Sequence, residues 1–451
     1  MKLSDALGLG AREVVAITGA GGKTGALYRL ASECLVRGQT VIATTTTHMW
    51  PPPAGDGWPL LLGSVREQRP RVAQALAAQG RAFVAQGFDA SGRLQGIAPG
   101  DVAILATLAD IVLVEADGAR GLWLKAPADH EPAIPPLASV VVHVVGLQVL
   151  GRPLDSAVVH RPERVAEVLQ VALGTPVTDD MVARLLVHPR GALQGVPAGA
   201  RVMAFCNQAE GSSLRMAGRR IAAQVLQAGG PVRRVVVGSL RQAPDACEGW
   251  APAAAIILAA GGARRFGRLK QAEVWQGRPL LAHAVDAALD SLAAEVRVVL
   301  GCQAERLLPL LANYDDRRLQ VVTNPAWTTG QASSIRAALT SLSSHVEAAV
   351  FCTADQPLLT GAEIDALMAR HAITGAPIVA PSVQGEFRSP VLFARALFPE
   401  LAALEGDIGG RTLIAHYRPQ VEAVEADDAR PYTDIDSQED LRRLADGEER
   451  N

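Results

Sequence analysis

A glycine-rich loop in the 451-residue sequence, "LAAGGARRFGRLK" (258–270), follows an apolar stretch and ends in cationic side chains. Gly261 and Gly262 remove side chains where a triphosphate could approach backbone N–H groups. Arg265 and Lys270 offer the positive charge that a pentacoordinate α-phosphorus and a departing pyrophosphate need. The loop therefore predicts phosphate chemistry. The alternatives are a solvated basic loop and a dinucleotide-binding loop, and the lack of G-x-G-x-x-G disfavours the second.

Acidic residues downstream of this loop complete a candidate metal site. "FCTADQP" ends an apolar stretch with Asp355, and "YTDIDSQED" places Asp434 and Asp436 in a second acidic turn. Magnesium needs only one or two protein carboxylates in addition to substrate phosphates. Asp355, helped by Asp434 or Asp436, is thus predicted to hold Mg²⁺ for metal-assisted nucleotidyl transfer. Each aspartate alone is structural about as often as it is functional.

A second glycine loop, "TGAGGKT" (18–24), follows another apolar stretch and opens a helical pattern. Backbone N–H groups at such a junction cradle phosphates. The usual P-loop spacing places glycine at position 17, which is Ile17 here, so a turn for tight strand-to-helix packing is the alternative. In the phosphate-binding interpretation, Lys23 contacts a β or γ phosphate and Thr24 is a ligand of magnesium. The predicted nucleotide-binding residues of this loop are Gly19, Gly21, Gly22, Lys23 and Thr24.

Two further features concern this first loop. "IVLVEADGAR" delivers Glu115 and Asp117 at the carboxyl end of a strand, where either carboxylate could orient the magnesium ion. His48 and His130 are isolated histidines that could be ligands or acid–base groups, although isolated histidines are more often structural. "FCNQAE" (205–210) lacks the lysine and aspartate of the N-K-x-D motif and does not assign guanine.

The elements that must position these residues alternate between short apolar strands and amphipathic helices, which predicts parallel strands with crossover helices. The stretch "SLRQAPDACEGWAPAA" (239–254) interrupts this rhythm. We therefore predict two doubly wound α/β domains, residues 1–248 with a P-loop-like fold and residues 249–451 with a Rossmann-like fold. Both glycine loops would lie at the carboxyl edges of their sheets.

Composition limits the classes of partner. The formal net charge is −3, with 20% charged and 49% hydrophobic residues, so the overall field would not attract nucleic acid or anionic lipid. Five scattered cysteines without a C-x-x-C pair argue against disulfides and zinc, and fit a reducing cytoplasm. No signal peptide or membrane span is expected.

Several motifs of the first half resemble the YqeC family, named as accessory proteins of selenium-dependent molybdenum hydroxylases. They are "GAGGKT", "TTTTHMWP", "EADGARGLWLKAPADHEP", and "VVGLQVLGRPL" with "VHRPE". The resemblance covers roughly residues 10–240. It implies a P-loop-like nucleotide fold, with ATP or GTP at the loop, and a role in enzyme maturation.

The second half resembles the molybdenum cofactor nucleotidyltransferases, whose opener is L-x-[AG]-G-x-x-x-R-[MF]-G-x-x-K, over roughly residues 252–445. The matching stretches include "NPAWTTGQASSIRAAL", "ADQPLLT", "SPVLF", "LEGDIGGRTL" and "DIDSQEDL". The family implies transfer of a nucleoside monophosphate from NTP·Mg²⁺ to the terminal phosphate of molybdopterin, with release of pyrophosphate. Ala260 in "LAAG", together with "GDIGGR", favours the cytidylyl branch. Glu273 and the Arg388-Ser389-Pro390 run depart from the family pattern.

The resulting hypothesis is a cytoplasmic fusion of a YqeC-type accessory domain with a molybdopterin cytidylyltransferase that uses CTP and Mg²⁺. Arg265, Lys270 and Asp355 are the predicted catalytic residues, and Asn324, Gly330 and Ser334 are expected to position substrate. Because the acceptor phosphate is already an anionic nucleophile, no general base is required. Two alternatives remain: guanylyl transfer to the same acceptor, and a non-catalytic chaperone that delivers the cofactor to an apo molybdenum hydroxylase.

Overall fold

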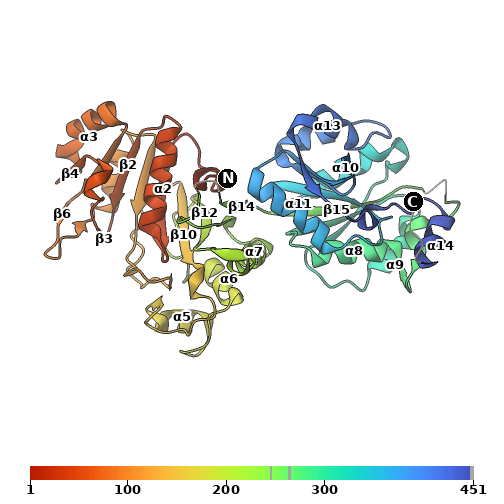
Figure 1. Ribbon diagram of the computed structural model, residues 1–451, viewed down its shortest axis with the longest axis horizontal. Coiled ribbons are helices and arrows are strands. Elements are labelled where there is room, and N and C mark those ends of the chain that lie inside the picture. The colour runs from red at the N-terminus through yellow and green to blue at the C-terminus, as the bar shows by residue number, and fades with distance from the viewer. Residues whose placement is uncertain (244–245, 263–265, 447–451) are drawn as a thin grey trace. The chain divides into compact units, whose positions relative to one another are not determined.

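The computed structural model describes residues 1–243, 246–262 and 266–446. The chain folds into two compact units, Met1–Trp250 and Ala251–Asn451 (Figure 1). Each unit contains its own sheet and its own buried core. No helix within the described ranges is long and apolar enough to cross a bilayer.

The first unit is built on a nine-stranded sheet with the order β14-β13-β12-β10-β1-β8-β2-β5-β4. All of its pairings are parallel except β13 with β14. The strands are β1 (Glu13–Gly19), β2 (Val41–Thr45), β4 (Leu60–Leu62), β5 (Arg81–Ala85), β8 (Ile111–Glu115), β10 (Val140–Gly146), β12 (Arg201–Asn207), β13 (Val232–Val237) and β14 (Glu248–Trp250). The central strands are buried along almost their whole length, as expected of parallel strands covered on both faces.

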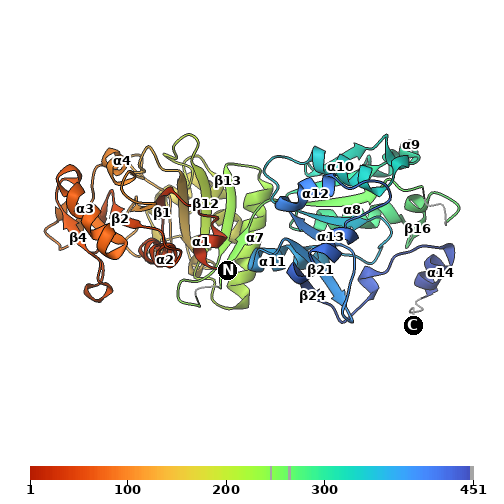
Figure 2. The same ribbon diagram turned by 90° about the horizontal axis from the view of Figure 1, so that it is seen from above.

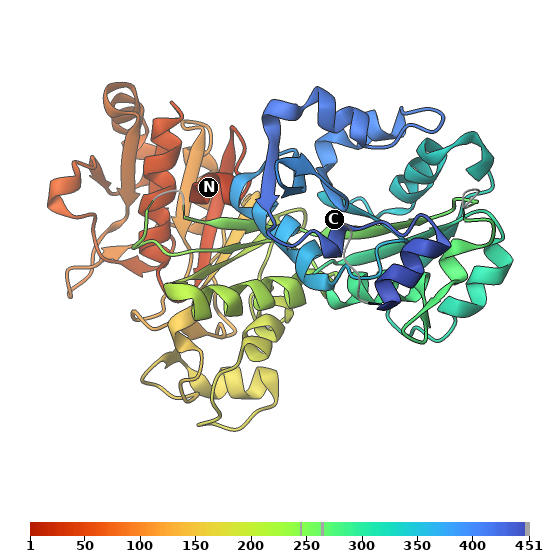
Figure 3. The same ribbon diagram turned by 45° about the vertical axis from the view of Figure 1, so that its right-hand side comes forward.

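Helices cover both faces of this sheet. One apolar cluster joins the sheet to α1 (Leu3–Ala6) and α2 (Lys23–Val36), and a second joins the opposite face to α3 (Val65–Gln79) and α4 (Val102–Leu105). Seen from above, α2 and α4 lie on opposite sides of β1 (Figure 2). Two helices, α5 (Pro162–Leu169) and α6 (Asp179–Val187), form a small lobe beside α7 (Gly211–Gln227), coloured yellow in Figure 3.

Short strands surround the carboxyl edge of this sheet. β9 (Leu124–Lys125) pairs with β11 (Val159–His160), and β7 (Leu94–Gln95) pairs with both β3 (His48–Met49) and β6 (Gly87–Phe88). These pairings hold the long loops that follow β2, β8 and β10 in place. The site described below is built from those loops.

The second unit contains a sheet with the order β19-β18-β15-β20-β23-β21-β22, with β24 also paired to β21. Its strands are β15 (Ala253–Ala259), β18 (Glu295–Leu300), β19 (Leu319–Thr323), β20 (Ala348–Thr353), β21 (Ile378–Val383), β22 (Glu386–Phe387), β23 (Val391–Ala394) and β24 (Val421–Glu425). β15, β18, β19 and β20 are parallel to one another, whereas β23 is antiparallel to β20 and to β21. The prediction of parallel strands with crossover helices therefore fails at β23, which lies between β20 and β21. The turn at Gln384 and Gly385 is too short for a crossover and reverses the chain.

The helices of the second unit also lie in two layers. α10 (Gln331–Ser341) and α13 (Arg411–His416) appear above the sheet in Figure 1, and α8 (Leu280–Asp290) and α9 (Ala304–Leu311) below it. α11 (Gly361–Thr374) packs on α8, and α12 (Phe398–Ala402) packs on α10. The last helix, α14 (Gln438–Asp446), contributes Leu441 and Leu444 to a small apolar cluster with Phe266, Trp275, Leu280, Leu358 and Ile435. The cluster holds the C-terminal acidic turn beside the glycine loop.

Candidate functional site

The first glycine loop joins β1 to α2 and adopts a conformation that requires glycine. Gly21 and Gly22 have φ angles of 82° and 124°. A Cβ at Gly21 would lie 2.2 Å from the backbone nitrogen of Gly146, and one at Gly22 would lie 2.4 Å from Nδ2 of Asn207. Asn207 Nδ2 donates to the carbonyl of Gly21 at 2.7 Å, and its Oδ1 accepts from the Leu240 N–H. Asn207 therefore supports the loop and has no free amide atom for reading a base.

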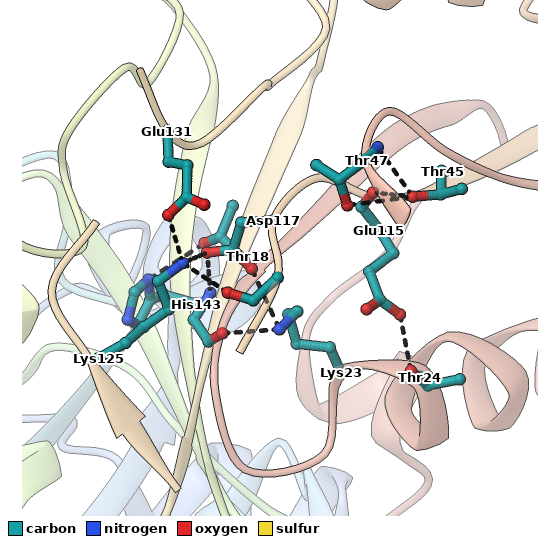
Figure 4. A network of polar contacts seen from close by, with 12 residues as sticks. Thr18, Lys23, Thr24, Thr45, Thr47, Glu115, Asp117, Lys125, Glu131 and His143 are labelled. Atoms are coloured by element: carbon teal, nitrogen blue, oxygen red, sulfur yellow. Dashed lines mark hydrogen bonds and ion pairs between the residues drawn. The ribbon is translucent and has the colours of Figure 1, made fainter. Parts of the chain in front are cut away.

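Lys23, the first residue of α2, turns its side chain back under the loop (Figure 4). Its ammonium group donates to the Gly19 carbonyl at 2.8 Å and pairs with Asp117 Oδ1 at 3.1 Å. The Gly19 N–H donates to Asp117 Oδ2 at 3.0 Å. Gly19 and Lys23, both predicted to bind nucleotide, thus use these polar groups within the protein, and Lys23 is only 5% exposed.

A chain of alternating charges continues from Asp117 (Figure 4). Lys125 is fully buried and lies 3.1 Å from Asp117 Oδ2, 2.8 Å from the Gly118 carbonyl and 2.9 Å from Glu131 Oε2. Arg161 Nη1 donates to Glu131 Oε2 at 2.6 Å. Burial alone would raise the pKa of Glu131, but the hydrogen bonds from Arg161 and Lys125 outweigh it and lower the pKa to about 2. For Lys125, Glu131 and Arg161 the sequence offered only the family motifs "KAPADHEP" and "VHRPE" as a signal.

Thr24 and Glu115, both predicted to bind magnesium, lie together. Thr24 Oγ1 donates to Glu115 Oε2 at 2.8 Å. Burial raises the pKa of Glu115, and the Lys23 charge opposes that change. Asp117, predicted for the same role, instead faces Lys23 and Lys125. Of the first loop's candidates, the pair of Thr24 and Glu115 therefore fits a cation best.

Three histidines of the first unit have different surroundings. His143 on β10 is buried, and its Nδ1 lies 3.1 Å from Thr18 Oγ1, whereas its Nε2 has no hydrogen-bond partner among the described residues. Burial lowers the pKa of His143 to about 4, so its ring is neutral at pH 7. His48 is half exposed and lies 4.0 Å from Asp89, and His130 is exposed.

A cavity of about 560 Å³ opens between the glycine loop and the loops that follow β2, β8 and β10. Its inner wall contains Gly21, Gly22, Lys23, Thr24 and Glu115. The remaining lining residues are Thr47, His48, Met49, Trp50, Arg93, Gly118, Ala119, Arg120, Gly121, Leu122, Glu131, His160 and Arg161. Its size is that of a site for a nucleotide-sized ligand.

The second glycine loop follows β15 and faces a cavity of about 570 Å³. The cavity brings together predicted site residues of the loop and of the strand end after β20: Ala260, Gly261, Gly262, Lys270 and Asp355. Lys270 Nζ donates to Asp355 Oδ2 at 2.7 Å and to Asp436 Oδ1 at 3.3 Å. Arg264 and Arg265 lie outside the described residues. Arg268 pairs with Glu273 at 2.6 Å, so the glutamate that departs from the family pattern neutralises a cation of the loop.

Gln271 fixes the second glycine loop. Its Nε2 donates to the carbonyls of Ala259 and Gly261 at 3.1 and 2.9 Å, and its side chain also lines the cavity. The sequence motifs assign this glutamine no role. The hydrogen bonds show that it holds the loop against the end of β15.

The predicted carboxylates gather on the other side of Lys270. Asp434 Oδ1 accepts a hydrogen bond from Gln356 Nε2 at 2.9 Å. Burial, and then the neighbouring charge of Asp355, raises the pKa of Asp434. Asp355 Oδ1 is buried and accepts no hydrogen bond from a described residue. An unsatisfied carboxylate oxygen beside a second acid is a suitable place for a cation.

These carboxylates do not form a complete metal cage. Within the described ranges no group of three or more His, Cys, Asp or Glu side chains is arranged to hold a metal ion. Magnesium does not require one, because substrate phosphates and water supply its other ligands. Asp355 and Asp434 therefore fit a metal that arrives with a nucleotide.

A second cavity, of about 450 Å³, adjoins the first at Thr353, Asp355 and Asp407. Its walls combine apolar side chains, such as Phe351 and Phe393, with Arg411 and Asp434. Asp355 thus stands where the two cavities meet. Two ligands that occupied them would approach each other at this carboxylate.

The three predicted positioning residues divide into two kinds. Gly330 and Ser334 line the first cavity of the second unit. Asn324 is buried and donates to Ser333 Oγ and Ser334 Oγ at 2.8 and 3.0 Å, while its Oδ1 accepts from the Ala326 N–H. Asn324 therefore shapes the loop that carries Gly330 and Ser334.

Comparison with known proteins gives the class of each unit. Residues 255–422 match the family model of the MobA-like NTP transferase domain, which makes the second unit a nucleotidyltransferase domain. Residues 15–163 match the family model of the YqeC protein. The chain is 35% identical over 199 residues to "Uncharacterized protein YqeC" of Escherichia coli (strain K12), covering 43% of this chain and 75% of that protein. The chain belongs to the YqeC family and carries a MobA-like NTP transferase domain in addition.

Other relatives match more weakly. The "Bifunctional protein GlmU" of Kineococcus radiotolerans is 36% identical over 127 residues. The match covers 28% of this chain and 26% of that protein. The solved Rv0371c homolog from Mycobacterium sp. strain JC1 is 28% identical, with a TM-score of 0.38 over 43% of this chain and 96% of that one. The molybdopterin-guanine dinucleotide biosynthesis protein A of Archaeoglobus fulgidus is 17% identical, with a TM-score of 0.34 over 43% and 97% of the two chains.

Proposed function

We propose that the second unit transfers CMP from CTP to the terminal phosphate of molybdopterin and releases pyrophosphate, as a step in the maturation of a molybdenum hydroxylase. One observation carries the proposal: Gly261, Gly262, Lys270 and Asp355 line one cavity, and Asp355 also borders the next. The first cavity would take the nucleotide and the second the acceptor.

The backbone N–H groups of Gly261 and Gly262 would hold the CTP phosphates together with Lys270 and Arg265. Asp355, with Asp434 or Asp436, would hold Mg²⁺, which when bound neutralises charge on the triphosphate. An acceptor phosphate oxygen forms a bond to the α-phosphorus as the bond from that phosphorus to the β-phosphate oxygen breaks. The acceptor oxygen is already anionic, so alignment and charge neutralisation carry the reaction.

Ala260 supports the choice of CTP. This residue lines the nucleotide cavity, and it lies so close to Gly301 that a Cβ at Gly301 would be 2.8 Å from that of Ala260. A methyl group at this position leaves less room for a purine than glycine would. Ala260→Gly should therefore raise the rate with GTP relative to CTP.

The test incubates the purified chain with molybdopterin, Mg²⁺ and each NTP in turn, and measures pyrophosphate. CTP should give the fastest release, and Asp355→Ala should lower the rate by about 10²- to 10³-fold because a cation-binding carboxylate is lost. Asp427→Ala, at an exposed aspartate of the same unit, is the matched control. Faster release with GTP would favour guanylyl transfer. No release with any NTP would reject transfer and favour a chaperone that delivers the cofactor to an apo-hydroxylase.

We also propose that the first unit binds the phosphates of ATP or GTP through Gly21, Gly22 and Thr24, with Mg²⁺ at Thr24 and Glu115, as in a P-loop. The cavity and the start of α2 at this loop support the proposal. Titration of the full chain with MgATP and MgGTP tests it. Thr24→Ala should lower the affinity about 10-fold, whereas Thr107→Ala, at an exposed threonine of the same unit, should not.

A further inference from the structure

The cavity of the first unit has an outer wall that the roles proposed above do not use. We define this outer wall as Trp50, Arg120, His160 and Arg161, all of which line the cavity of about 560 Å³. Trp50 follows β3, Arg120 lies in the loop after β8, and His160 and Arg161 join β11 to α5. Three segments distant in sequence thus place an aromatic ring and basic side chains around one opening.

Trp50 lines the cavity with 64% of its surface exposed. The neighbouring Trp58, by contrast, packs against Tyr28 and Phe83, with ring centroids 6.0 and 6.4 Å away. An indole that stays exposed at a cavity offers a flat face on which a planar ring can stack. The exposure of Trp50 therefore points to a ligand with such a ring.

Arg120 is held in an unfavourable backbone conformation. Its φ angle is 51°, in the left-handed region, and the adjoining turn is fixed by hydrogen bonds from Leu122 N–H to the Ala119 carbonyl and from Gly21 N–H to the Leu122 carbonyl. Its exposed guanidinium makes no hydrogen bond or ion pair with any residue that the structure describes. Strain that fixes a free cation beside a cavity is typical of a binding position.

The basic groups of the outer wall are incompletely neutralised. Burial, and then the charges of Lys125 and Arg161, lowers the pKa of His160; Arg120 adds to this effect and Glu131 opposes it. Lys125 and Arg161 share Glu131, and Lys125 also pairs with Asp117, so Arg120 adds a positive charge that no carboxylate of a described residue neutralises. Such a field favours an anionic group, and arginine is the side chain best suited to phosphate.

We propose that the outer wall binds a planar heteroaromatic ring that carries a phosphate, with the ring on Trp50 and the phosphate at Arg120 and Arg161. Purine nucleoside monophosphates and phosphorylated pterins share this chemistry. The site is separate from the phosphate position at Gly21–Thr24. It does not depend on nucleotidyl transfer by the second unit.

The experiment titrates the full chain with AMP, neopterin monophosphate and ribose 5-phosphate by calorimetry. Trp50→Ala should weaken the binding of AMP or neopterin monophosphate about 10-fold, because stacking of the ring is lost. The affinity for ribose 5-phosphate, which has no aromatic ring, should not change. Arg120→Gln should weaken all phosphate probes about 10-fold. Phe88→Ala and Arg152→Gln, at exposed positions of the same unit outside the cavity lining, are the matched controls.

Tight binding of AMP would identify a nucleotide as the ligand, and tight binding of neopterin monophosphate a pterin. The proposal is overturned if neither binds, or if Trp50→Ala binds both as the wild type does. Thr24→Ala should weaken the binding of MgATP and leave the binding of AMP and neopterin monophosphate unchanged. Equal weakening of all three would reject a separate site. Pyrophosphate release by Trp50→Ala and Arg120→Gln should equal that of the wild type, so a failure of the cytidylyl proposal would be recognised independently.

Discussion

The two glycine loops have the same position in their sheets but differ in how deeply their lysine–aspartate pairs are buried. Both follow a buried parallel strand, and both bring a lysine close to an aspartate. Lys23 and its partner Asp117 are almost completely buried, whereas Lys270 contacts Asp436, whose side chain is 57% exposed. From this difference we propose that Lys23 stabilises the fold, whereas Lys270 is available to a ligand.

The location of each lysine explains the difference. Lys23 begins α2 and folds back to the carbonyl of Gly19, inside a layer closed by Lys125. Lys270 lies at the end of its loop, in a short 3₁₀ turn, and reaches across to the end of β20. Lys270 and Asp355 are 12% and 24% exposed, more than Lys23 and Asp117 at 5% and 2%, and such partly exposed charges can exchange partners with a ligand.

The largest effect is expected from Lys125, the buried cation of the first unit. Lys125→Met would leave Asp117 and Glu131 buried without their shared partner, and should lower the free energy of unfolding by about 3–5 kcal/mol. Urea unfolding followed by circular dichroism measures this change. Arg152→Met, at an exposed position of the same unit, should change the free energy by less than about 0.5 kcal/mol. A loss for Lys125→Met no larger than that of the control would contradict the buried network.

Lys270 should show the opposite behaviour. Lys270→Met removes a cation from the proposed nucleotide cavity, so pyrophosphate release should fall about 100-fold, or about 2.7 kcal/mol in the activation barrier. The free energy of unfolding should change by less than about 1 kcal/mol, because its ion pairs are only partly buried. Arg442→Met, at an exposed arginine of the same unit, should leave both quantities unchanged. A stability loss as large as that of Lys125→Met would remove the distinction between the two loops.

Much of this arrangement was predictable because it is local in the sequence. Apolar runs identified the strands, and parallel pairing then placed Lys270 and Asp355 at one edge of a sheet. The contacts of Glu131 with Lys125 and Arg161 were not predictable, because they depend on the pairing of the two-residue strands β9 and β11. The antiparallel β23 was missed for a similar reason, since its direction is set by a two-residue turn.

The two units should also respond to pH in opposite directions. His143 is neutral when folded, and its pKa falls from 6.5 to about 4. The unfolded chain therefore binds more protons between these values, and the stability of the first unit should fall as pH drops from about 6.5 towards 4. His143→Asn cannot titrate but can still bond to Thr18, so it should lose about 3 kcal/mol less than the wild type between pH 7 and pH 4.

Urea titrations at the two pH values measure this difference. His130→Asn, at an exposed histidine, should lose as much stability as the wild type. Equal pH dependence in His143→Asn and the wild type would show that folding does not lower the pKa of His143.

The smallest effect concerns Asp365 on α11, in the second unit. Burial raises its pKa from 3.8 to about 6, while a hydrogen bond from the Leu292 N–H at 2.7 Å opposes that change. Between these pH values the carboxyl of Asp365 is protonated in the folded chain and ionised in the unfolded chain. Its contribution to the free energy of unfolding is therefore complete below about pH 3.8 and is lost as pH rises through 6. Asp365→Asn keeps the acceptor and cannot ionise, so between pH 4 and pH 7 it should gain about 2 kcal/mol relative to the wild type. Asp427→Asn should show no gain, and a wild-type-like pH response in Asp365→Asn would show that folding does not raise the pKa of Asp365.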